Sequence, residues 1–80
     1  MNMRSVFARN LRLLRQRSAL SQEKLATLAG LDRNYVGKLE REQNSPTIDT
    51  VEVLAVALGV DFQRLVAHPP AHVQGEKRAD

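Results

Sequence analysis

The sequence predicts an all-α protein in which five helices form one small bundle. Apolar residues recur three and four positions apart, and residues that commonly begin or end helices separate these stretches. No run alternates apolar and polar residues for long enough to form a strand. We expect one domain over residues 1–67, because 80 residues cannot bury a second core, and a disordered tail over residues 68–80, which contain few apolar side chains.

The first two helices follow from apolar spacing and from polar caps. A helix over residues 5–17, capped by Ser5, presents its apolar residues on one face. Ser21 can accept a hydrogen bond from the first turn of a second, short helix. Gly30 can adopt the left-handed conformation that ends this helix.

Asp32 is the expected cap of a third helix over residues 33–41, whose inward side chains are Val36 and Leu39. A short helix, a tight turn that begins with Gly30, and a helix of about nine residues form an arrangement in which the later helix can enter the major groove of DNA. An ordinary helical hairpin gives the same pattern, so the spacing alone leaves both interpretations open.

The last two helices are separated from the first three by a loop over residues 42–46. Thr47 or Asp49 is expected to cap the fourth helix, which Gly59 ends, and Asp61 to cap the fifth. The inward side chains expected from these two helices are Val51, Leu54, Ala55, Leu58, Phe62 and Leu65.

Composition excludes several classes of protein. The chain has no Cys, which excludes disulfides and thiolate zinc sites, and Pro residues between His68 and His72 break the helix that could align them on a metal. No apolar run approaches the length of a membrane span, and the start is too rich in Arg for a signal peptide, so we expect a cytoplasmic protein without a membrane partner. No phosphate-binding loop and no nucleophile with a base can be assembled, so neither an enzyme nor a cofactor is expected.

Charge is distributed unevenly along the chain. Residues 1–17 contain five Arg and no acid, whereas residues 46–66 contain three acids and one Arg. One basic end is typical of a protein that meets a polyanion. A solvated, Arg-rich helix face is the alternative, and composition does not separate the two.

Five spaced segments carry a more specific signal than helix spacing does. They are residues 20–26, 29–36, 39–41, 46–51 and 55–60. Together they resemble the phage-repressor and Cro type of helix-turn-helix regulators, also described as xenobiotic-response-element-like, over residues 5–66. Residues 32–36 also resemble the controller proteins of restriction-modification systems, which are stand-alone dimers of about this size. The resemblance implies a repressor-like fold and a transcriptional regulator, repressor or activator, that binds a double-stranded inverted-repeat operator as a homodimer.

The resemblance also implies roles for single residues. Arg33, Asn34 and Lys38, with Gly37 beside them, match the base-reading positions of the recognition helix, and their chemistry agrees, since Arg and Lys pair with guanine and Asn with adenine. The basic first helix and the ends of the next two supply the expected phosphate contacts, which are Arg9, Arg12, Gln22, Tyr35, Arg41 and Asn44. A pair expected to be structural, joining the first helix to the third, consists of Arg15 and Glu40.

Two residues depart from the family pattern. Glu42 stands where the family usually has Gly, so a left-handed helix end costs roughly 1 kcal/mol there and brings a negative charge near the phosphates. Gly37 replaces a commoner Ser. Close approach to a groove and simple tolerance of Gly explain this equally well.

Val53 and Val56 form a second apolar edge on the fourth helix, which Val60 and Val66 can extend. Valines placed together predict a dimer interface, although isolated exposed valines are common. The main alternative to a DNA-binding regulator is an antitoxin-like or adaptor protein whose principal role is to bind a partner protein.

Overall fold

The structure is a computed structural model that describes residues 2–68. The described chain contains five helices, α1 (Met3–Arg17), α2 (Gln22–Leu28), α3 (Tyr35–Glu40), α4 (Ile48–Leu58) and α5 (Phe62–Val66), and no strand. The predicted all-α, five-helix fold is therefore confirmed. The tail predicted to be disordered, including His72, lies beyond His68 and thus almost wholly outside the described residues.

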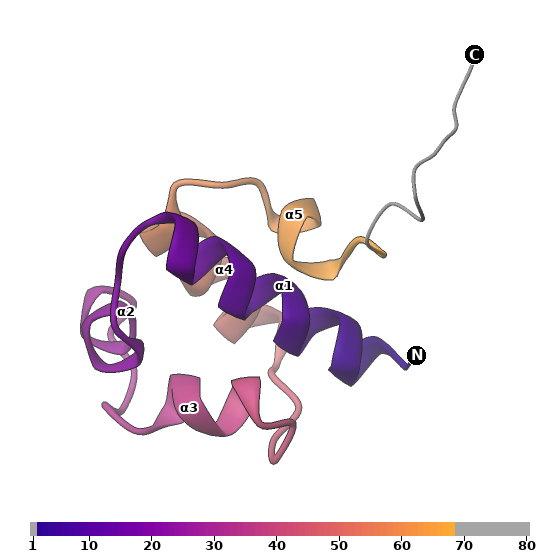
Figure 1. Cartoon of the computed structure of the whole chain (residues 1–80), viewed down its shortest axis with the longest axis horizontal. Helices are drawn as coiled ribbons and strands as arrows, with labels where there is room; N and C mark the ends of the chain where they lie inside the picture. The colour runs from indigo at the N-terminus through magenta and orange to yellow at the C-terminus, as the bar shows by residue number, and fades with distance from the viewer. Residues whose placement is uncertain (1, 69–80) are drawn as a thin grey trace.

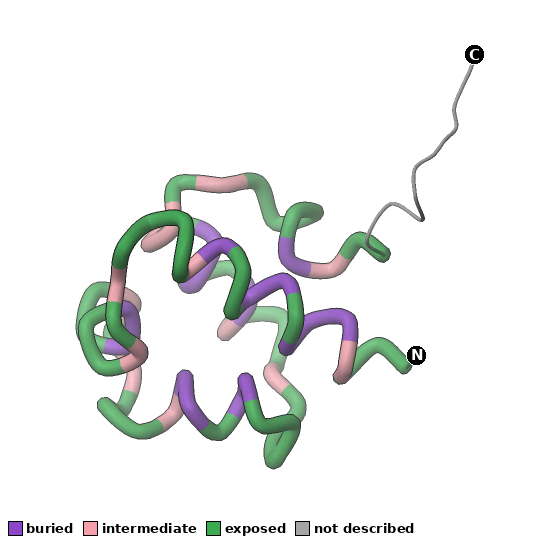
Figure 2. The backbone as a smooth tube through the Cα atoms, viewed as in Figure 1, coloured by how far each residue is buried: buried purple, intermediate pink, exposed green. Residues whose placement is uncertain are grey.

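The helices form a closed ring around one core. In Figure 1, α1 crosses the middle of the molecule, with α3 below it and α5 above it. Helix α1 packs against α3 and α5, and α2 packs against α3 and α4, while α4 contacts α5. Every helix contributes to a single buried cluster, and Figure 2 shows the buried residues of α3 on the side that faces α1. Its fully buried leucines are Leu11, Leu25, Leu39, Leu54 and Leu65.

Helix α1 begins at Met3, with Asn2 as its cap, so the prediction that Ser5 caps this helix was wrong. The side-chain oxygen of Asn2 accepts a hydrogen bond from the backbone N–H of Ser5 at 2.9 Å. Asn caps a helix as well as Ser does, and the helix extends to the earlier cap. The Ser5 hydroxyl is left available for another partner, Glu42.

Other predicted helix ends are confirmed. The hydroxyl of Ser21 accepts from the Lys24 N–H at 2.9 Å, and that of Thr47 accepts from the Thr50 N–H at 3.1 Å. Gly30 follows α2 and Gly59 ends α4, both at positive φ. Asp61 occupies the cap position of α5, but its side chain makes no capping hydrogen bond.

Helix α3 is shorter than the predicted 33–41, because Arg33 and Asn34 form a turn before it. The Asp32 carboxylate accepts from the Asn34 N–H at 3.1 Å, and the Asp32 carbonyl accepts from the Tyr35 N–H at 3.0 Å. A carboxylate that bonds two residues ahead stabilises a turn rather than the first turn of a helix. Asp32 therefore shapes the turn and does not cap α3 as predicted.

The core differs from the prediction at the last helix. Leu65 is fully buried, but Phe62 is 38% exposed, so the prediction that Phe62 lies in the core was wrong. Helix α5 has five residues and can turn only a narrow face inward, which Leu65 occupies. Leu58, also expected in the core, is partly buried and packs against the cluster.

Candidate nucleic-acid interface

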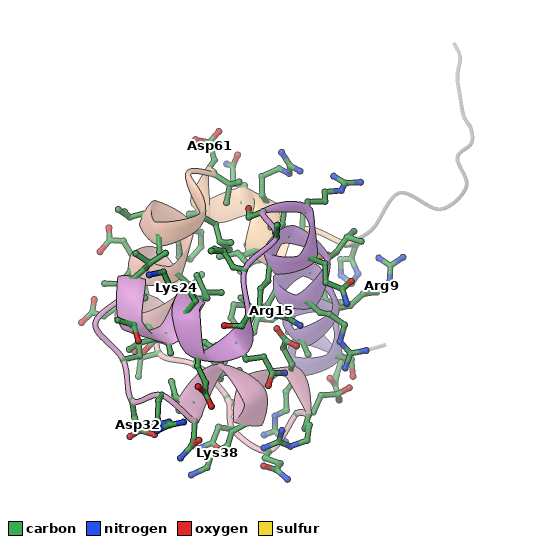
Figure 3. The ribbon with its side chains drawn as sticks, turned by 60° about the vertical axis from the view of Figure 1, so that its left-hand side comes forward. Arg9, Arg15, Lys24, Asp32, Lys38 and Asp61 are labelled. Carbon is green, nitrogen blue, oxygen red and sulfur yellow. The ribbon has the colours of Figure 1, made fainter. Side chains whose placement is uncertain are left out.

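One end of the molecule presents the predicted base-reading side chains. Arg33, Asn34 and Lys38 are all exposed. The Lys38 N–H donates to the Asn34 carbonyl at 3.3 Å, so these two residues stand one helical turn apart and share a face. Figure 3 shows Lys38 pointing away from the protein at the α3 end, with Asp61 at the opposite end. Behind this face, Val36 and Leu39 are fully buried, as predicted.

Arg33 is paired with Glu23 from the first turn of α2. Arg33 Nη2 lies 2.9 Å from Glu23 Oε2, and both side chains are well exposed. The hydrogen bond that Arg33 donates to Glu23, and then the charge of Glu23, raise the pKa of Arg33 above its ordinary value. Arg33 keeps further N–H groups that Glu23 does not use, because a guanidinium carries five. Sequence reasoning missed Glu23, whose only signal was its acidic charge near the start of a helix.

Gly37 does not lie on the exposed face beside Lys38, where the sequence placed it. Gly37 is buried, because the side chains of Arg41 and Gln22 lie over it. Tyr35 is partly buried and packs against the core cluster, while Arg41 and Asn44 are exposed at the far end of α3 and in the following loop.

A buried carboxylate ties three helices together beneath this surface. The side chain of Glu40 is 1% exposed, and Arg15 donates to it twice, from Nε at 2.6 Å and from Nη2 at 3.1 Å. The ion pair implied by the resemblance is thus present. Arg15 also donates to the Leu20 carbonyl at 2.8 Å, and Figure 3 shows its side chain directed from α1 toward the centre of the molecule.

Gln22 and Arg12, both predicted phosphate contacts, also approach Glu40. Gln22 Nε2 donates to Glu40 Oε1 at 3.0 Å, and Arg12 Nε lies 3.7 Å from the same oxygen. The Gln22 amide has a second N–H, which remains available for a phosphate oxygen. Arg9 is exposed on the flank of α1, and Figure 3 shows it well separated from Lys38.

Glu42 adopts the left-handed conformation predicted from its position, with φ of 62°. Its carboxylate accepts a hydrogen bond from the Ser5 hydroxyl at 2.7 Å. The carboxylate therefore turns toward α1. Glu42, Arg9 and Arg12 line one hollow of about 530 Å³. Two cations near this charge reduce its repulsion of a phosphate backbone.

The four valines predicted to form one dimer interface do not line one hollow. Val53 and Val56 lie beside the exposed Leu28, and Val56 is 77% exposed. Val66 lines a separate hollow of about 250 Å³, whose other apolar residues include Met3, Ile48 and Phe62. Val60 is partly buried against the core.

Two further observations concern the part of the chain from residue 2 to residue 68. No helix there is long and apolar enough to cross a membrane. No group of three or more His, Cys, Asp or Glu side chains gathers there in a way that could hold a metal ion.

Comparison with known proteins defines the class. Residues 11–65 match the family described as Helix-turn-helix, and the chain belongs to this family of transcriptional regulators. Control protein C.SmaI of Serratia marcescens is 38% identical over 66 residues, which cover 82% of this chain and 79% of that protein.

Two solved structures are similar in fold and sequence. The hypothetical transcription factor NHTF from Neisseria superposes with a TM-score of 0.83 at 41% identity, covering 85% of this chain and 78% of that one. The restriction-modification controller protein C.AhdI from Aeromonas hydrophila gives 0.75 at 44% identity, covering 78% and 94%. The predicted resemblance to helix-turn-helix regulators, including controller proteins, is confirmed, and these relatives are regulators rather than enzymes.

Proposed function

We propose that the chain is a sequence-specific regulator that binds a double-stranded operator as a homodimer in the cytoplasm. The observation that carries this proposal is the exposed set of Arg33, Asn34 and Lys38, held in front of a buried segment of α3. These side chains present donors that match guanine O6 and N7 and the edge of adenine in the major groove. Because the backbone behind them is fixed by the core, their geometry is largely set before DNA binds.

Phosphate contacts supply the sequence-independent part of the affinity. Arg12, Gln22, Arg41 and Asn44 are at least partly accessible, and Arg9 is exposed on α1. Gln22 lies near both Arg41, over Gly37, and Arg12, beside Glu40. Each phosphate that the arginines among them neutralise releases counterions, so affinity should fall steeply with salt.

A dimer supplies the discrimination that one recognition helix lacks. A single helix covers only a few base pairs, whereas two copies related by a two-fold axis read an inverted repeat with half-sites about 34 Å apart. Interfaces favour Met and aromatic side chains and avoid charged ones at their centre. The hollow lined by Met3, Ile48, Phe62 and Val66 contains no acid, and its one charged residue is Arg4, a residue type that interfaces favour, whereas Glu52 lines the hollow beside Val53 and Val56. We therefore assign the dimer contact to the Ile48 and Phe62 surface.

Selection of bound sites from random duplexes tests the proposal. The selected sites should share an inverted repeat, and binding should weaken as salt rises from 50 to 200 mM by about 10³-fold or more if six or more phosphates are contacted. Failure to enrich any motif would contradict sequence-specific binding. Capture of a partner protein that persists at high salt, together with such a failure, would favour the antitoxin-like or adaptor alternative.

A further inference from the structure

Gly37 has no side chain, and two other side chains occupy the space where one would stand. A Cβ atom added to Gly37 would lie 2.9 Å from Arg41 Nη1 and 3.0 Å from Gln22 Oε1. Both distances are shorter than ordinary contacts, so any other residue at this position must displace these two groups. Because both groups approach the same point, the ends of Arg41 and Gln22 lie next to each other on the backbone of α3.

The backbone of α3 does not itself require glycine at this position. The positive-φ glycines among the described residues are Gly30 and Gly59, so Gly37 has a conformation that any residue can adopt. Glycine inside a helix is less favourable than alanine. The structural reason for Gly37 is therefore the space that it leaves above α3.

The two side chains that fill this space differ in how they are held. The Gln22 side chain is held by a hydrogen bond, because its Nε2 donates to the buried carboxylate of Glu40. Arg41 is exposed, and no carboxylate within residues 2–68 forms an ion pair with it, in contrast to Arg33. Arg41 therefore brings an uncompensated positive charge beside the Gln22 amide, whose oxygen lies over Gly37 and whose second N–H remains available for a phosphate oxygen.

We propose that Gly37 is a positioning residue: because it has no side chain, Arg41 and Gln22 can lie together at the edge of α3 and bind a phosphate as a pair. This inference rests on the proposed function, and it replaces a base-reading role for Gly37 itself. It explains why a residue that weakens the helix stands in the segment that meets DNA. It also requires stability and DNA binding to change in opposite directions when the space is filled.

Gly37→Ala makes this test. The melting temperature should rise, because alanine favours the helix, the flexible Arg41 side chain can move aside, and Gln22 needs to shift only slightly. The dissociation constant for all duplexes should rise by about tenfold, the effect of losing a hydrogen bond to a charged group. The slope of log K against log salt should fall by about 0.9 for each phosphate that the variant no longer neutralises. Sites selected from random duplexes should keep the same motif.

A matched control and a double variant separate positioning from a general effect on the helix. Thr27→Ala, at an exposed position on α2, should raise stability without changing the salt slope. In an Arg41→Ala background, Gly37→Ala should lose most of its effect on binding, because its partner is already absent.

An unchanged salt slope in Gly37→Ala, or an equal effect with and without Arg41, would overturn the inference. A lost preference at a single base pair would instead assign Gly37 to close approach to the groove and would also overturn it. These outcomes are distinct from failure of the proposed function, in which the unsubstituted protein selects no motif.

Discussion

Replacing Arg15 with Ala measures how far the fold depends on the buried carboxylate of Glu40. Arg15 and Glu40 have side chains that are 13% and 1% exposed, so the change leaves a desolvated charge without its bidentate partner. Breaking such a buried pair costs about 3–5 kcal/mol. Gln22 and Arg12 remain near Glu40, which favours the lower end, about 3 kcal/mol. A domain of this length has a free energy of unfolding of only about 4–12 kcal/mol, so the loss is a large share.

Urea unfolding followed by circular dichroism measures the effect. The urea concentration at the midpoint should fall, while the dependence of the unfolding free energy on urea concentration should stay the same. The melting temperature should fall by about 12–24 °C, since each kcal/mol corresponds to about 4–8 °C in a domain of this size. Arg9→Ala is the matched control, because Arg9 is an exposed arginine on the same helix that forms no ion pair within residues 2–68, and it should change stability by no more than about 0.5 kcal/mol.

The cause of the destabilisation can be tested with the double variant Arg15→Met and Glu40→Met. Apolar side chains of similar volume remove both charges, so this variant should regain most of the stability that Arg15→Ala loses. If Arg15→Ala costs less than about 1 kcal/mol, or if the double variant is as unstable as the single one, the assumed cost of an unpaired buried charge is wrong.

Four further predictions concern binding and assembly. Arg33→Ala should cost about 1–3 kcal/mol on the selected site and relax preference at one base pair, whereas equal loss on random duplexes would make Arg33 a phosphate contact. Arg12→Ala should weaken binding to all sequences alike and lower the salt slope by about 1; an unchanged slope would remove it from the footprint. Glu42→Gly should tighten binding to all duplexes by removing a negative charge, and its stability should stay within about 1 kcal/mol, because relieved backbone strain offsets the missing hydrogen bond to Ser5. Ile48→Lys should give a folded monomer by sedimentation while Val56→Lys remains dimeric, and the reverse result would assign the interface to the Val53 and Val56 surface.

Helix ends that depend on neighbouring residues could be predicted from the sequence. Ser21, Thr47 and Gly59 act within one turn of their own position, so their roles follow from local chemistry. The start of α1 could not be chosen in this way, because both Asn2 and Ser5 are competent caps. Only the assembled helix shows which of the two lies outside it.

The candidate site likewise contains features that local sequence predicts and features that depend on how the helices pack. Exposure of Lys38 follows from the helical period once Val36 is known to face inward, whereas Arg33 lies in the turn before α3, where that period does not apply. The contact of Arg33 with Glu23, and the cover over Gly37, depend on how α2 crosses α3, which no local pattern specifies. The exposure of Phe62 has the same kind of cause, since it depends on which face of α5 meets α1 and α4.

Helix α3 has too little intrinsic preference to form by itself. It has six residues, it contains Gly37, and its cap residue Asn34 makes no side-chain capping bond. Isolated helices shorter than about 12–15 residues are marginal in water, so tertiary contacts must hold this one. Those contacts are the buried Val36 and Leu39, and the carboxylate of Glu40, which also orients Gln22. The shape of the segment that we propose faces DNA therefore depends on the core behind it, and substitutions that loosen that packing should weaken the proposed operator binding even at positions away from the proposed DNA contacts.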